Sequence, residues 1–169
     1  MLVHSTSLTT HETIVNTRDT AAGDFLDKVA RALQVPWGDK MPGAALETWS
    51  DINDADADTC LADIERWGLP RPLTNDKEHV LAYSFTGLRT AIEKCVHEGG
   101  DQMGVEDKKS LGRAAQILMF EHVMNKTTRA ISHFDELDEG KLVISGGVAS
   151  NQSFREAYYQ QPPLKLRLG

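Results

Sequence analysis

Short strand-like runs open the chain and are followed by a longer segment with helical character. Residues 2–6 and 12–18 are β-rich and flank the polar turn LTTH, which predicts an antiparallel hairpin. A helix is expected next, from about Thr20 to Leu33. Its charge order fits the helix dipole, with acidic residues near the positive end and basic residues further along: Asp19, Asp24 and Asp27, then Lys28 and Arg31.

The middle of the chain is interrupted by proline, glycine and acidic residues. Pro and Gly punctuate a loop at 36–43, after which AALETW (44–49) predicts a short helix. An acidic run at 51–58 precedes CLADIERW (60–67), a short amphipathic helix ended by Gly68 and Pro70. We interpret about 50–78 as an excursion from the core.

The second half begins with another strand-turn-helix pattern. HVLAYSF (79–85) is predicted to be extended, Gly87 to allow a tight turn, and LRTAIEKCV (88–96) to be helical. A long helix is expected from about Glu106 to Leu137. Next, LVI (142–144) predicts a strand that runs through two glycines into a helix at 149–158, and residues 158–169 are expected to be irregular.

The composition indicates a globular protein but says little about its function. A chain of 169 residues, with 40% hydrophobic and 25% charged residues, is typical of one globular domain. A net charge of −7 opposes unaided binding to a polyanion. The two cysteines have no CxxC spacing, the six histidines show no metal-ligand spacing, and no apolar run approaches the roughly 20 residues that cross a bilayer. We therefore expect no membrane association and no transition-metal site within these residues.

The strongest candidate site is LVISGGVASN (142–151). Gly146 and Gly147 lie between a predicted strand and a helix start, where backbone N–H groups and the helix dipole favour phosphate or ribose oxygens. Asn151 is a candidate for a hydrogen bond to a sugar or base edge. A plain turn that needs glycine for its φ angles explains the pattern equally well.

Two acidic segments have plainer alternatives. Asp24 and Asp27, three residues apart on one helix, could contact ribose hydroxyls, but a solvated helix start explains them as well. Residues 54–65 partly match a calcium-loop template, with Thr59 where the sharp turn requires glycine. We interpret this acidic run as a cap for the helix that follows it.

Taken together, four segments resemble the tRNA threonylcarbamoyl transferase family, formerly called glycoproteases. They are RDTAAGDFLDKVAR (18–31), PGAALE (42–47), YSFTGLRTAI (83–92) and LVISGGVASN (142–151), in the order of the family. The opening segment is most similar to the mitochondrial branch, fungal members especially. The resemblance covers residues 1 to about 157 and implies part of a longer enzyme.

This resemblance implies an α/β fold of the actin-like ATPase type (ribonuclease H-like), with a mixed β-sheet flanked by helices. Residues 1–157 would be its second, nucleotide-binding lobe. It also implies that Asp27 contacts the substrate nucleotide, that Gly43 or Ala44 matches a glycine-pair contact, and that Asn151 matches an asparagine contact. Asp24 stands where the family usually has glutamate.

The family transfers a threonylcarbamoyl group from its adenylate to the adenosine following the tRNA anticodon. The resemblance implies threonylcarbamoyl-adenylate or AMP/ATP as ligands, tRNA as substrate, a homodimer beside a separate adenylate synthase, and a mitochondrial location. One divalent metal ion is expected in the full-length enzyme, with ligands outside this chain. The alternatives are a non-catalytic nucleotide-binding fragment and another actin-like ATPase.

Overall fold

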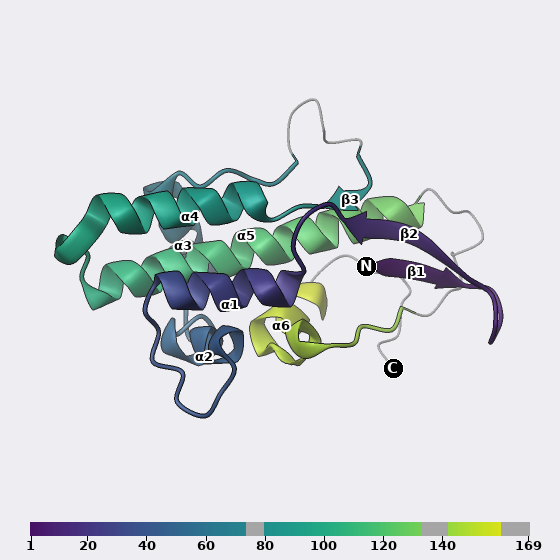
Figure 1. Ribbon diagram of the computed structural model, residues 1–169, viewed down its shortest axis with the longest axis horizontal. Helices are drawn as coiled ribbons and strands as arrows, with labels where there is room; N and C mark the ends of the chain where they lie inside the picture. The colour runs from purple at the N-terminus through teal and green to yellow at the C-terminus, as the bar shows by residue number, and fades with distance from the viewer. Residues whose placement is uncertain (74–79, 133–141, 160–169) are drawn as a thin grey trace.

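A computed structural model describes residues 1–73, 80–132 and 142–159 of the chain (Figure 1). The described part is a mixed α/β arrangement in which a small sheet lies at one end of a group of helices. The α/β class predicted from the sequence is thereby confirmed.

In the part of the chain that the structure describes, three strands form the sheet, in the order β1-β2-β3. Strands β1 (Leu2–Ser5) and β2 (His11–Thr17) pair antiparallel, which confirms the predicted hairpin. Strand β3 (Ala82–Tyr83) pairs parallel to β2, so the sheet is mixed. The extended run predicted at 79–85 is thus much shorter as a strand, because only two of its residues are in register with β2.

The predicted helices are present in the expected order. They are α1 (Ala22–Ala32), α2 (Pro42–Trp49), α3 (Ala57–Trp67), α4 (Thr86–Gly99), α5 (Val105–Ser132) and α6 (Gln152–Tyr159). Two 3-10 turns, Gly100–Gln102 and Gly147–Ser150, precede α5 and α6. The last part of the long helix predicted to reach Leu137 lies outside the described residues.

Helix α5 lies at the centre of the helical layer, and every other helix contacts it. Its buried residues are distributed around its circumference, as is typical of a helix with neighbours on several sides. Gly112 faces side chains of the neighbouring helices closely, since a Cβ there would lie 3.2 Å from Leu46 Cδ1 and 3.3 Å from Leu33 Cδ1. The absence of a side chain at Gly112 therefore lets α5 pack closely against α1 and α2.

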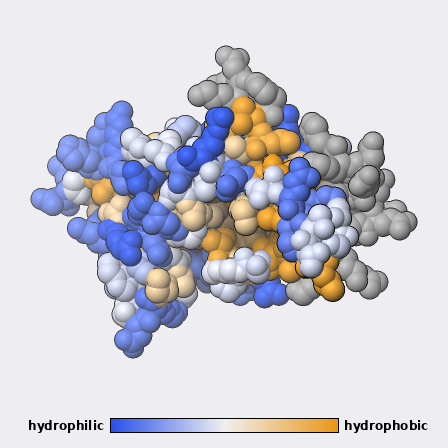
Figure 2. All heavy atoms as spheres, turned by 45° about the vertical axis from the view of Figure 1, so that its right-hand side comes forward, coloured by the Kyte–Doolittle hydropathy of each residue, from blue (hydrophilic) through white to orange (hydrophobic). Residues whose placement is uncertain are grey.

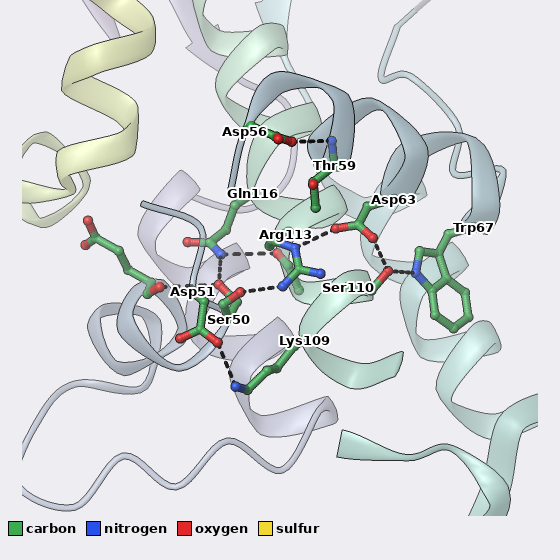
Figure 3. A network of polar contacts seen from close by, with 12 residues as sticks. Ser50, Asp51, Asp56, Thr59, Asp63, Trp67, Lys109, Ser110, Arg113 and Gln116 are labelled. Atoms are coloured by element: carbon green, nitrogen blue, oxygen red, sulfur yellow. Dashed lines mark hydrogen bonds and ion pairs between the residues drawn. The ribbon is translucent and has the colours of Figure 1, made fainter. Parts of the chain in front are cut away.

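A network of polar contacts joins α3 to α5 (Figure 3). Asp63 accepts hydrogen bonds from Arg113 Nε and from the Ser110 hydroxyl, both at 2.5 Å. The Trp67 indole N–H donates to the same Ser110 hydroxyl at 2.9 Å. Arg113 also donates to the Ser50 carbonyl at 2.8 Å, so the network reaches the end of α2.

The acidic run before α3 has the capping role predicted for it. Asp56 accepts a hydrogen bond from the Thr59 backbone N–H at 2.8 Å and is the N-cap of α3. Gly68 ends the helix with φ 54°, a left-handed conformation that glycine adopts readily.

Two predictions about the junctions between elements are wrong. The apolar LVI at 142–144 does not form a strand: none of the strands within the described ranges pairs with it, and a strand requires a hydrogen-bonded neighbour. Gly87 does not make the turn before α4, because it already lies inside the first turn of that helix. The junction occurs at Phe85, which has φ −124° and ψ −11°.

The surface is uneven in character. Figure 2 shows hydrophilic residues over the end of the molecule away from the strands, and hydrophobic residues gathered towards the strand end. Large hydrophobic residues with exposed side chains include Leu8 in the hairpin turn and Val143 before α6. Within the described ranges, no helix has both the length and the apolar character needed to cross a membrane.

Candidate functional site

Asp27 lies on α1 and faces the start of α2. Its Oδ1 accepts a hydrogen bond from the Gly43 backbone N–H at 2.8 Å. A Cβ at Gly43 would lie only 3.0 Å from both Asp27 Oδ1 and Leu26 Cβ. The structure therefore brings these two candidates into direct contact, and the close approach of the two helices explains the glycine at position 43.

The other candidates on these two helices lie at the surface. Asp24 pairs with Lys28 one turn later at 2.7 Å and accepts a hydrogen bond from the Thr20 hydroxyl. Hydrogen bonds from Lys28 and Thr20 lower the pKa of Asp24. Ala44 is exposed on α2. Asp24 is therefore solvated and paired, as the plainer interpretation of the acidic pair expected.

The two glycines of the Gly-Gly segment have different conformations. Gly146 has φ 103° and ψ 176°, a region that favours glycine, so the conformational explanation holds for this residue. Gly147 has no positive φ and begins the 3-10 turn. A Cβ at either glycine would meet nothing within 4 Å, so both backbones border open space.

Asn151 is buried, with 5% of its surface exposed. Its side-chain Oδ1 accepts a hydrogen bond from the Phe154 backbone N–H at 2.9 Å, which caps the start of α6. The side-chain oxygen thus has an intramolecular role, whereas the contact to a sugar or base edge stays a prediction.

Glu47 connects α2 to the Gly-Gly segment and was not identified from the sequence. Its Oε1 accepts a hydrogen bond from the Gln152 backbone N–H at 2.7 Å, at the first residue of α6. On the neighbouring helix, a Cβ at Gly23 would lie 3.9 Å from Val148, which places the start of α1 beside the 3-10 turn. The first turn of α1 and the end of α2 therefore both border residues 147–152.

Asp19 is the second residue that the sequence did not single out for this role. We expected it near the positive end of the helix now seen as α1, where it accepts a hydrogen bond from the Thr20 N–H, but its carboxylate also lies at the start of α4. It accepts hydrogen bonds there from the Ser84 hydroxyl at 2.6 Å and the Phe85 N–H at 2.9 Å. A cap supplied from 66 residues away leaves no local sequence pattern.

The segment 18–31, which contains α1, thus contacts each of the other segments that were singled out in the sequence. Figure 1 shows α1 between α4 and α5 on one side and α2 and α6 on the other. Asp27 contacts the segment 42–47, Asp19 contacts 83–92, and Gly23 lies near 142–151. Segments far apart in the sequence therefore form one cluster around this helix.

Comparison with known proteins shows the family of the chain. The model of the TsaD family, tRNA N6-adenosine threonylcarbamoyltransferase, matches residues 1–167. The chain belongs to this family. Similar curated relatives include the mitochondrial tRNA N6-adenosine threonylcarbamoyltransferase of Schizosaccharomyces pombe, 36% identical over 161 residues, which cover 92% of this chain. The enzyme of Lactiplantibacillus plantarum is 33% identical over 153 residues, which cover 90% of this chain.

The chain spans well under half the length of these TsaD relatives, 36% of the Schizosaccharomyces protein and 38% of the Lactiplantibacillus protein. Among the residues that the structure describes, no group of three or more His, Cys, Asp or Glu side chains could hold a metal ion. The part described here therefore does not fit a metal centre.

Proposed function

We propose that this chain is the nucleotide-binding lobe of a tRNA N6-adenosine threonylcarbamoyltransferase, with a fold of the actin-like ATPase type. The observation that supports this most is the cluster around α1, because each segment of the family resemblance in the chain contributes to it. In this proposal residues 1–157 form the lobe, with an excursion at about 50–78. The irregular tail expected from 158 is wrong for its first two residues, which belong to α6, and the rest of it lies outside the described residues.

The charges and backbone groups of the cluster suit a nucleotide. Asp27 uses Oδ1 for the Gly43 N–H, and its other oxygen accepts a ribose hydroxyl in this proposal. Gly146 and Gly147 admit the phosphate or sugar, because no side chain blocks their backbones. Asn151 orients the ligand with its amide NH₂ while its oxygen caps α6. Asp24, Gly43 and Ala44 complete the surroundings of the ligand.

The whole enzyme, in this proposal, transfers the threonylcarbamoyl group from its adenylate to the adenosine following the anticodon of tRNA, and releases AMP. Its divalent metal ion is held by residues other than those described here. A homodimer, a separate synthase for the adenylate and a mitochondrial location complete the proposal. The mitochondrial Schizosaccharomyces relative supports the location.

The first test separates ligand contacts from intramolecular ones. Asp27→Asn keeps an acceptor for the Gly43 N–H and removes the charge, and Asn151→Asp keeps the α6 cap and removes the NH₂ donors. We expect each variant to bind AMP about ten- to a hundredfold more weakly by calorimetry, as for loss of a hydrogen bond to a ligand. The unfolding midpoint should change little. Unchanged AMP affinity in both variants would reject the assignment.

A second test separates the enzyme from its alternatives. Turnover of tRNA with the adenylate donor supports the transferase, whereas AMP binding without turnover identifies a non-catalytic nucleotide-binding module. Hydrolysis of ATP without carbamoyl transfer would instead identify another actin-like ATPase.

A further inference from the structure

Asp19 makes more hydrogen bonds than a single helix cap requires. Its Oδ1 accepts from the backbone N–H groups of Thr20 at 2.6 Å and Phe85 at 2.9 Å. Its Oδ2 accepts from the Ser84 hydroxyl at 2.6 Å and the Thr86 N–H at 3.3 Å. One carboxylate therefore binds the chain that enters α1 and the first residues of α4 at the same time.

Neither helix has an N-cap side chain that hydrogen-bonds its own first turn, although α1 has Asp24 in its first turn. Helix α4 has Phe85 as its N-cap, with no side-chain cap hydrogen bond and no acidic residue in its first turn. Helix α1 has Ala21 as its N-cap, also without a side-chain hydrogen bond. Asp19 thus supplies the negative charge at the positive end of α4 and fixes the residue that leads into α1.

The electrostatics agree with a carboxylate that stays charged. Partial burial opposes the charged form, but hydrogen bonds from Ser84 and from the backbone N–H groups of Phe85, Thr20 and Thr86 outweigh it. They lower the pKa of Asp19 to about 2. At neutral pH the side chain accepts from all of its donors and donates to none.

We propose that Asp19 is a positioning residue for nucleotide binding. Asp19 holds the residues that precede α1 against the start of α4. It thereby sets where Asp24 and Asp27 lie relative to the two glycines, Gly146 and Gly147. Asp19 itself does not touch the nucleotide. This inference rests on the proposed function, since it concerns the same binding site.

Asp19→Asn tests the proposal, with Asp56→Asn as the matched control. Asparagine keeps one acceptor but places an NH₂ group against other donors. Both residues accept hydrogen bonds from backbone N–H groups at the start of a helix, Asp19 at α4 and Asp56 at α3. We expect each change to lower the melting temperature by about 2–4 °C. Only Asp19→Asn should weaken AMP binding, by about tenfold.

The same samples provide a second readout that needs no ligand. In amide NMR spectra, Asp19→Asn should shift the signals of Gly23, Asp24 and Asp27 in α1 as well as those of α4. A cap with a purely structural role would move only the α4 signals. If Asp19→Asn does not fold, Ser84→Ala removes one donor to the carboxylate and should weaken AMP binding about threefold.

The outcomes separate this inference from the proposed function. Loss of AMP affinity in Asp27→Asn with unchanged affinity in Asp19→Asn would overturn the positioning role and leave the binding site intact. Equal losses of affinity in Asp19→Asn and the Asp56→Asn control would overturn it too. If the unaltered chain binds no AMP, the proposed function fails for this chain, and shifted or unshifted α1 signals decide the role of Asp19.

Discussion

The attachment of α3 to α5 provides a sharp test of the energetics, because two ion pairs of different burial join the same helices. Asp63 pairs with Arg113 at 2.5 Å, with side chains only 11% and 13% exposed. Asp107 pairs with Arg66 at 2.5 Å, with side chains 35% and 53% exposed. The distances match, so the pairs differ in burial and in the further hydrogen bond that Asp63 accepts from Ser110. Asp63→Asn and Asp107→Asn remove one charge from each pair without changing side-chain volume.

The expected free energies differ several-fold. Asp63→Asn leaves the Arg113 guanidinium largely buried, with the Ser50 carbonyl as its remaining neutral acceptor. Breaking a buried pair from one side costs about 3–5 kcal/mol, because the remaining charge has lost both water and partner. Asparagine still accepts one hydrogen bond, so we expect the lower end, about 3 kcal/mol. The exposed pair should contribute at most about 1 kcal/mol, since water solvates Arg66 when its partner is neutral.

Urea unfolding followed by circular dichroism measures both changes, and thermal unfolding checks them. For a chain of this size, about 3 kcal/mol lowers the melting temperature by roughly 6–12 °C, against at most about 4 °C for Asp107→Asn. The double variant Asp63→Leu/Arg113→Met should recover most of the loss, since a buried pair is often replaceable by apolar side chains. Equal losses for the two single variants would refute the argument from burial.

Further predictions follow from packing and from titration. Gly112→Ala should destabilise the chain by about 1–3 kcal/mol in urea unfolding, since its Cβ would lie 3.2 Å from Leu46 and 3.3 Å from Leu33. Gly87→Ala, where a Cβ meets nothing within 4 Å, should not destabilise it, and equal losses would contradict this reasoning. For His122, burial and the nearby Lys126 charge lower the pKa from 6.5 to about 4, although Asp19 and the Pro72 carbonyl oppose this. Between pH 6.5 and pH 4 the unfolded chain therefore binds more protons than the folded chain. The free energy of unfolding should fall as the pH drops through this range, by on the order of 1 kcal/mol per pH unit. His122→Gln should flatten this part of the curve, and an unchanged slope would show that His122 is not its source.

Much of the fold could be predicted because its signals are local. The hairpin, the order of the helices and the cap of α3 at Asp56 depend on residues a few positions apart. The strand expected at 142–144 depends on a neighbour instead. An apolar run such as LVI shows that a segment favours an extended conformation, but not that another strand lies beside it.

The residues of the candidate site also divide into those that the sequence identifies and those that only contacts between distant segments identify. The sequence singled out Asp27, Gly146 and Asn151 through the residue pattern and a family resemblance, but it gave no reason to pair Asp27 with Gly43. The contacts of Glu47 with α6 and of Asp19 with α4 were not predicted, because the partners lie 105 and 66 residues away. No periodicity or spacing rule connects residues at such separations.

The sequence alone determined which segments are helical, which residues can cap or turn the chain, and to which family the chain belongs. The tertiary structure alone decided which backbone N–H each carboxylate accepts, and which segments meet around α1. The physical reason is that capping and periodicity act within one or two turns of the chain. A hydrogen bond such as that from Gln152 to Glu47 exists only after packing has brought two distant helices together.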